Sequence, residues 1–156
     1  MDESARVVVP WDLDRLSEKR LRAVYTALQS FAARLLEWGE EVPSCWYAPG
    51  HQVHRFAALL YWFERVNRPR TLVLDPETGK ERIDPAASAR DAAEWFASPW
   101  GLTGMRDVWR QKGCKAGRDV HGDEPTPSLE QVIRQHAVRN ARRQRPASPS
   151  PAENRQ

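Results

Sequence analysis

Two cysteines, each followed closely by a histidine, are the residues of this sequence best suited to chemistry. His51 follows Cys45 after five intervening residues, and His121 follows Cys114 after six. The chain has no other cysteine and two further histidines. Thiolate and imidazole are ligands that zinc prefers, and four of them in a tetrahedron close a structural site. We therefore predict a structural zinc site formed by Cys45, His51, Cys114 and His121.

This prediction has a simpler alternative, because neither pair has the short Cys-x-x-Cys spacing of common zinc motifs. Under that alternative the cysteines are ordinary buried residues, as free cysteines often are, and the histidines lie at the surface. His54 could replace His51 as a ligand, since it lies three residues further along the same expected helix. His136 falls on an apolar helix face, which favours a hydrogen-bonded core residue over a metal ligand.

The segment Ser44-Cys45-Trp46 resembles the surroundings of the nucleophile in papain-like thiol proteases. That pattern is incomplete, because no glycine precedes Cys45 directly and no glutamine lies just upstream. The sequence also lacks paired carboxylates, a nucleophile elbow and a phosphate-binding glycine loop. We therefore expect no catalytic activity and no small-molecule substrate, with a thiol enzyme centred on Cys45 as the alternative.

Length and apolar patterning narrow the class of protein. The 156 residues are enough for one domain with its own core. The longest apolar run, residues 56–63, is far shorter than the roughly 20 residues that span a bilayer. The start of the chain is acidic and interrupted by Pro10, unlike a secretory signal. We expect a cytoplasmic protein without a membrane segment, whose cysteines are reduced, buried or metal-bound.

Basic residues gather near the C-terminal end. Residues 128–156 carry six arginines against two glutamates, a net charge of +4, so the rest of the chain sums to −1. Arginines on successive helical turns could neutralise phosphates. One hypothesis is therefore a nucleic-acid surface formed by Arg134, Arg139, Arg142, Arg143 and Arg145. The alternative is a solvated helix end, where positive charge favours the helix C-terminus.

Apolar spacing predicts a mainly α-helical domain of four to five helices. A stripe at helical spacing covers residues 16–38, and Gly39 suits the position after the helix end. A second helix is expected from about Gly50 to the residue before Pro69. Further helices are expected over residues 85–97, with Asp84 as the N-cap, and up to Gln111. Residues 71–84 have the turn chemistry of a short hairpin, and residues 112–127 are expected to form an irregular loop.

These elements give the predicted organisation of the chain. We expect the helical domain over residues 1–127, a basic helix over 128–145, and a disordered tail over 146–156, where Pro, Ser and Ala are frequent. Trp46, Trp62 and Trp100 fall in loops or off the apolar stripes, so they are candidates for an exposed interface.

The stretch that begins near Cys45 is similar to an uncharacterised actinobacterial family, domain-of-unknown-function family 4913, which is found on plasmids, integrative elements and phages. The first matching features are the turn Trp38-Gly39-Glu40-Glu41-Val42, Cys45, the aromatic pair Trp46-Tyr47 and His51. The later ones are the loop Gly113-Cys114-Lys115-Ala116-Gly117, followed by His121, Pro125 and Pro127.

The resemblance covers about residues 20–127, with three departures, one of which is a longer spacing from Cys114 to His121. Trp95-Phe96 stands where the family usually has Trp-His, and residues 70–90 look like an insertion. The resemblance implies an accessory protein of a mobile element, and it implies no mechanism because the family has no established activity. We therefore predict a non-catalytic binding module with a protein or nucleic-acid partner.

Overall fold

In the computed structural model, which describes residues 11–67, 72–83, 86–114, 120–121 and 124–145, five α-helices and two small antiparallel hairpins follow one another along the chain. The mainly helical prediction is therefore confirmed. The helices are α1 (Glu18–Glu37), α2 (Val53–Val66), α3 (Ala86–Ala97), α4 (Leu102–Gln111) and α5 (Leu129–Gln144), with a short 3-10 helix η1 (Leu13–Arg15) before α1. The hairpin strands are β1 (Leu72–Leu74), β2 (Glu81–Ile83), β3 (Val120–His121) and β4 (Glu124–Pro125).

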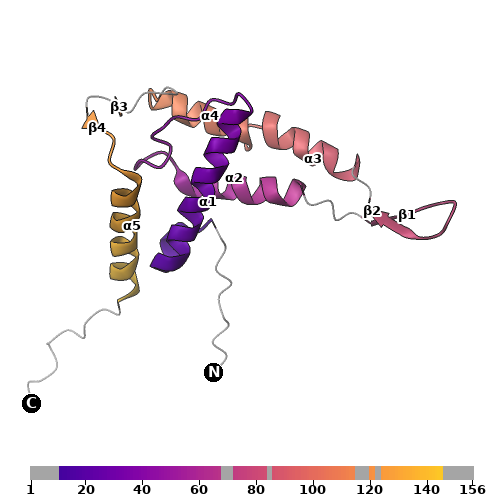
Figure 1. Cartoon of the computed structure of the whole chain (residues 1–156), viewed down its shortest axis with the longest axis horizontal. Coiled ribbons are helices and arrows are strands. Elements are labelled where there is room, and N and C mark those ends of the chain that lie inside the picture. Colours follow the sequence, from indigo (N-terminus) through magenta and orange to yellow (C-terminus); the bar gives the residue numbers. More distant parts are fainter. Residues whose placement is uncertain (1–10, 68–71, 84–85, 115–119, 122–123, 146–156) are drawn as a thin grey trace, which may run out of the picture.

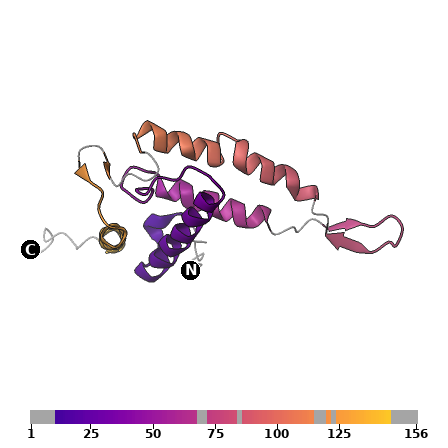
Figure 2. The ribbon, with the colours of Figure 1, turned by 45° about the horizontal axis from the view of Figure 1, so that its top comes forward.

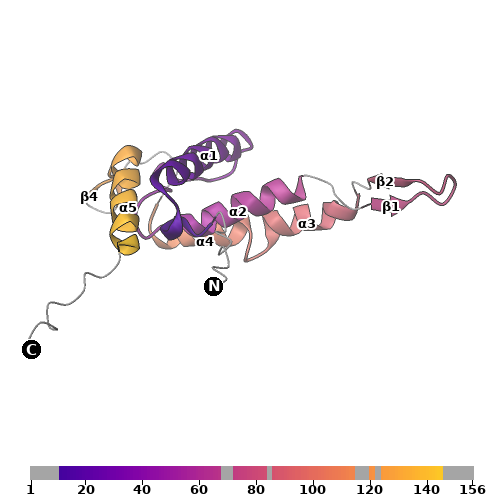
Figure 3. The same ribbon diagram turned by 90° about the horizontal axis from the view of Figure 1, so that it is seen from below.

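Helix α2 lies at the centre of the helical body. Helix α1 packs against it from one side, while α3 and α4, arranged nearly end to end, pack against the other (Figures 2 and 3). Helix α5 lies beside α1 and η1, at the end away from the β1–β2 hairpin (Figure 1). That hairpin, which pairs Leu72 with Ile83, extends beyond the ends of α2 and α3. The fold is thus three helical layers with α2 in the middle.

The limits of α1 follow from its capping residues. The Ser17 side chain accepts a hydrogen bond from the Arg20 amide at 3.4 Å and so caps the first turn. At the other end Gly39 has a φ of +81°. The amide of Glu40 then reaches back to the Leu35 carbonyl at 2.9 Å, which is the hydrogen bond of a Schellman motif. The expected apolar stripe of α1 is buried: Leu21, Tyr25, Leu28, Phe31, Ala32 and Leu35.

Aromatic rings on α2 hold the layers together. Phe56 is fully buried, and its ring centroid lies 5.5 Å from that of Trp46 and 5.3 Å from that of Trp109. It also lies 5.5 Å from Phe31 on α1. Such aromatic pairs add about 0.5–1.5 kcal/mol each beyond their area of burial. One side chain therefore contacts α1, α4 and the loop that contains Cys45.

Helices α3 and α4 meet at a bend that excludes side chains. A Cβ atom on Gly104 would lie 1.7 Å from the Pro99 carbonyl oxygen, and one on Gly101 would lie 2.0 Å from that of Trp95. Only glycine fits at these two positions without moving the backbone. Helix α4 packs beside α2, and Cys114, just after the end of α4, contacts Cys45 and His51 in the loop before α2.

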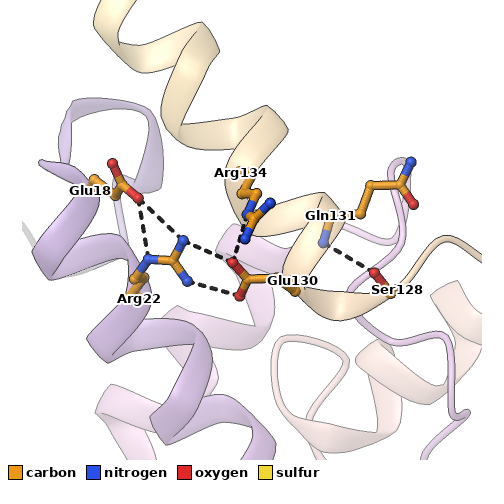
Figure 4. Close-up of polar contacts among 6 residues, drawn as sticks. All are labelled: Glu18, Arg22, Ser128, Glu130, Gln131 and Arg134. Carbon is orange, nitrogen blue, oxygen red and sulfur yellow. Dashed lines mark hydrogen bonds and ion pairs between the residues drawn. The ribbon is translucent and has the colours of Figure 1, made fainter.

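Helix α5 is attached to α1 by charged side chains near its first turn. Arg22 donates two hydrogen bonds to the Glu130 carboxylate, at 2.8 and 3.0 Å, and two more to Glu18, both at 3.2 Å (Figure 4). The Ser128 side chain accepts a hydrogen bond from the Gln131 amide at 3.2 Å and caps the helix, as expected for a helix starting near Ser128.

Buried polar contacts attach the other end of α5. The Asn140 amide nitrogen donates to the carbonyls of Leu13 and Leu16, at 2.9 and 3.1 Å, on either side of the turn of η1. Asn140 is 2% exposed. The basic helix is therefore packed onto η1 and α1 along its length, with one face available to solvent.

Three sequence predictions need correction. Helix α2 begins at Val53 rather than near Gly50, because Gln52 adopts a left-handed conformation with φ of +53°. Trp46 is 5% exposed and belongs to the core instead of an exposed interface, whereas Trp100 is 81% exposed. The expected irregular loop over 112–127 contains the β3–β4 pair. The predicted N-cap Asp84 and the tail over 146–156 lie outside the described residues.

The described helices contain no stretch that is both long and apolar enough to cross a membrane.

The contact between Arg22 and Glu130 predicts a pH-dependent part of the stability. Hydrogen bonds from Arg22, and then from Arg134, lower the pKa of Glu130 from 4.5 to about 2. A carboxylate with a lowered pKa in the folded state stabilises that state above its unfolded pKa, and this contribution disappears as the pH falls towards the folded pKa. We expect Glu130→Gln to lower the urea midpoint at pH 7, and the difference from wild type to shrink steadily below about pH 4.5.

The matched control is Glu64→Gln, which replaces an exposed glutamate of α2 without an ion pair to any described residue. Its urea midpoint should stay close to wild type at neutral pH. A Glu130→Gln difference that stays constant from pH 7 to about pH 3 would contradict this assignment.

Candidate metal centre

Three of the four predicted zinc ligands converge on one buried point. Cys45 and His51 come from the loop between α1 and α2, and Cys114 comes from the end of α4. The Sγ atoms of the two cysteines are 3.3 Å apart, and His51 Nε2 lies 3.5 Å from Cys45 Sγ and 2.9 Å from Cys114 Sγ. Cys45 and His51 are fully buried and Cys114 is 8% exposed. The side chains thus form a compact triangle of potential ligand atoms.

Successive tight turns bring Cys45 and His51 together. The Ala48 amide donates to the Cys45 carbonyl at 2.9 Å, and the His51 amide donates to the Ala48 carbonyl at 3.1 Å. These turns double the chain back on itself within seven residues. The left-handed Gln52 then redirects it into α2, so His51 lies in the turn before the helix rather than on a helical flank. Sequence reasoning missed this because a left-handed glutamine has no clear signal.

A glycine positions Cys114. Gly113 has a φ of +73°, and the Cys114 amide reaches back to the Trp109 carbonyl at 3.2 Å. This is the same Schellman arrangement that ends α1, and it turns the cysteine inward immediately after the helix. The Trp109 ring stacks edge-on against Phe56, so the last turn of α4 is fixed beside α2.

The orientation of His51 suits metal binding. Its Nδ1 atom lies 3.4 Å from the Pro49 carbonyl oxygen. A carbonyl can only accept, so this contact assigns the hydrogen to Nδ1 and leaves a lone pair on Nε2, the atom that faces both sulfurs. A metal-bound histidine usually donates its other ring N–H to a carbonyl or carboxylate in this way.

The two sulfurs do not form a disulfide. Their separation of 3.3 Å is well beyond a covalent S–S bond of about 2.05 Å. Around tetrahedral zinc, bond lengths of about 2.3 Å to sulfur and 2.0 Å to nitrogen put two sulfurs about 3.8 Å apart and sulfur and nitrogen about 3.5 Å apart. The separations among Cys45, His51 and Cys114 are within about 0.6 Å of these values. The triangle is therefore compatible with a bound metal ion such as zinc, which would require only small side-chain movements.

The remaining histidines have different positions. His121 lies in β3, and because its side chain is outside the described residues, its role as the fourth ligand stays a prediction. His54 is exposed in the first turn of α2 and is not part of the ligand group found among the described residues. It therefore does not replace His51.

His136 is a core histidine, as its apolar face predicted. It is 7% exposed, and its Nε2 lies 2.9 Å from Asp14 while its Nδ1 lies 3.1 Å from the Tyr25 hydroxyl. Donation from Nε2 to the carboxylate leaves Nδ1 to accept from Tyr25. Burial raises the pKa of Tyr25 to about 12. Burial also raises the pKa of Asp14, but hydrogen bonds from His136 and Arg143 outweigh it and leave this pKa below its usual value.

A cleft of about 630 Å³ opens beside this histidine. Its walls are the segment around η1, the loop over 47–54, Tyr25 of α1 and one face of α5. No sequence pattern predicted the cleft, because its walls come from distant segments, of which η1 and α5 are more than 100 residues apart. The loop over 47–54 also contains His51, so the candidate metal site lies directly behind one wall.

The five arginines predicted to bind nucleic acid differ in whether they form ion pairs with carboxylates. Arg134 pairs with Glu130 at 2.8 Å, and Arg143 pairs with Asp14 at 2.7 Å. The other three, Arg139, Arg142 and Arg145, form no ion pair with a carboxylate of the described residues. Two of these exposed arginines are therefore paired with carboxylates of the same chain, and the other three are not paired within the described residues.

Comparison of this chain with protein-family models, with curated proteins and with solved structures finds no match. Membership of the actinobacterial family therefore stays a prediction from the residues quoted for it.

Proposed function

We propose that this chain is a small helical binding module held together by a structural zinc ion. Cys45, His51 and Cys114 supply three ligands, and His121 supplies the fourth. The observation that carries the proposal is the convergence of three buried ligand atoms from two loops, with His51 and Cys114 separated by 63 positions in the sequence. Two thiolates and two imidazoles form one of the common ligand sets of structural zinc.

The ion would act as a cross-link between two layers of the fold. One ligand loop leads into α2, and the other follows α4. The ion would hold together two segments that are far apart in the unfolded chain, where no site exists. The free energy of metal binding would therefore add to the free energy of folding. Zinc would thereby fix both the start of α2 and the end of α4.

Burial supports this structural role over the thiol-enzyme hypothesis. Reactive cysteines are normally partly exposed in an electropositive surrounding. Cys45 is fully buried, with His51 and Cys114 packed against its sulfur. A substrate would have to displace these neighbours before it could reach the thiol.

The resemblance to the actinobacterial family is the sole basis for a proposal about the biological role. We place the module among accessory proteins of plasmids, integrative elements or phages, where it would contact a protein or nucleic-acid partner. The sequence similarity around Cys45 and Cys114 supports this, because the two ligand loops are the segments that carry the resemblance.

Zinc content and stability test the metal proposal. We expect the tag-free protein to contain one equivalent of zinc and its melting temperature to fall by about 10 °C or more after chelation. Cys114→Ser should lose the metal and show no further change on chelation. His54→Ala, which alters an exposed histidine outside the ligand group, should keep both the zinc and the melting temperature. A wild-type protein without metal, insensitive to chelator, would refute the proposal.

Zinc binding by His121→Ala distinguishes a site with four protein ligands from a site with three. Loss of an outer ligand should weaken zinc binding while leaving some metal bound, because Cys45, His51 and Cys114 remain. Unchanged zinc affinity would remove His121 from the site and leave the fourth position to another group.

A second candidate function, nucleic-acid binding by α5, is favoured by one observation. Arg139, Arg142 and Arg145 lie on the described surface without a partner carboxylate. Free guanidinium groups on consecutive helical turns can neutralise successive phosphates and release counterions. A solvated helix end remains the competing interpretation.

Salt dependence distinguishes these interpretations. If three arginines contact phosphates, log K for a short DNA should fall with log salt at a slope of about −2 to −3. Arg142→Gln should reduce that slope by about one. Arg90→Gln alters an exposed arginine of α3 whose ion-pair partner among the described residues is Glu94, and it should change nothing. Absence of binding at low salt would remove nucleic acid from the functions considered for α5.

A further inference from the structure

The cleft beside α5 has the volume of a small-molecule site, and aromatic side chains line it. Its volume of about 630 Å³ lies within the range of about 300–1,000 Å³ found for small-molecule pockets. Trp11, Tyr25 and Tyr47 all line it. Trp11 is 36% exposed, and its ring is braced by Tyr61 at a centroid distance of 5.1 Å. An aromatic ring entering the cleft would therefore find a partly exposed tryptophan already held in place.

The charges in the cleft favour an anionic ligand. Its two carboxylates are occupied, since Asp12 pairs with Arg15 and Asp14 contacts His136 and Arg143. Arg139 also lines the cleft, and it forms no ion pair with a carboxylate of the described residues. Arg139, on the α5 wall among aromatic residues, is thus available to pair with an anionic ligand.

Arg139 also belongs to a second, shallower groove along the outer face of α5. That groove, of about 360 Å³, is lined by Arg134, Gln135, Val138, Arg139 and Arg142. The cleft and the arginine face therefore meet at one residue. A phosphate at Arg139 would be positioned for its backbone to follow α5 while the attached base points into the cleft.

We propose that this cleft receives one base of a single-stranded nucleic acid whose phosphates follow the arginines of α5, a proposal that rests on the nucleic-acid role of α5 above. Aromatic platforms beside a basic track are the common basis of single-strand binding, because every base has a stacking face. A duplex keeps its bases stacked and paired, so it can contact the arginines but cannot fill the cleft.

Fluorescence anisotropy with a labelled oligothymidylate of about 12 nucleotides, and with a duplex of the same length, tests this at low salt. We expect the single strand to bind more tightly than the duplex. Trp11→Ala should weaken single-strand binding by about 5- to 100-fold, the range for loss of one stacked base, and leave duplex binding unchanged. Trp11→Phe should retain most of the affinity, which separates stacking from a loss of structure.

Further variants separate binding of a base in the cleft from binding of phosphates by the arginines of α5. Arg139→Gln should weaken both nucleic acids, and Arg90→Gln should weaken neither. Equal binding of single strand and duplex, or full single-strand affinity in Trp11→Ala, would overturn the cleft proposal and leave an arginine surface. Absence of binding to both nucleic acids would overturn the α5 proposal together with this one, without affecting the zinc proposal.

Discussion

Packing around Phe56 is the interaction on which both the fold and the candidate metal site depend. Its ring lies between Trp46, the residue after Cys45, and Trp109, five residues before Cys114. Because both rings contact the same side chain of α2, the two ligand loops are brought to the same end of that helix. The convergence of the sulfurs is therefore a consequence of core packing, and a bound zinc ion would reinforce an arrangement that the aromatic core already favours.

The ligand loop also connects the metal site to the surface. Residues 47–54 contain His51 on the inner side and form a wall of the cleft on the outer side. The opposite wall is α5, which Asn140 and His136 attach to the segment around η1. Fixing the loop by zinc and fixing α5 by buried hydrogen bonds would thus set the width of the cleft from both sides.

Local patterns predicted much of the architecture. The apolar stripe and Gly39 defined α1, Ser128 marked the start of α5, and the turn residues over 71–84 marked a hairpin. These features depend on neighbouring residues only, through helical periodicity, capping and turn geometry. The pairing of each cysteine with a nearby histidine likewise predicted four ligands, of which the structure brings Cys45, His51 and Cys114 together.

Features set by distant residues could not be predicted in the same way. Glutamine has no preference of its own for the left-handed conformation that Gln52 adopts, so the sequence predicts the start of α2 too early. The partners of His136 lie 111 and 122 positions away in the sequence. Trp46 is only a candidate for an exposed interface by sequence, because its burial depends on Phe56 and Tyr25, which no local pattern reveals.

X-ray absorption at the zinc K edge of the wild-type protein is the most direct test of the metal centre, because it reports the ligand atoms themselves. We expect a tetrahedral shell of two sulfurs at about 2.3 Å and two nitrogens at about 2.0 Å. A zinc shell without sulfur, or a protein that takes up no zinc when the metal is supplied, would contradict the account.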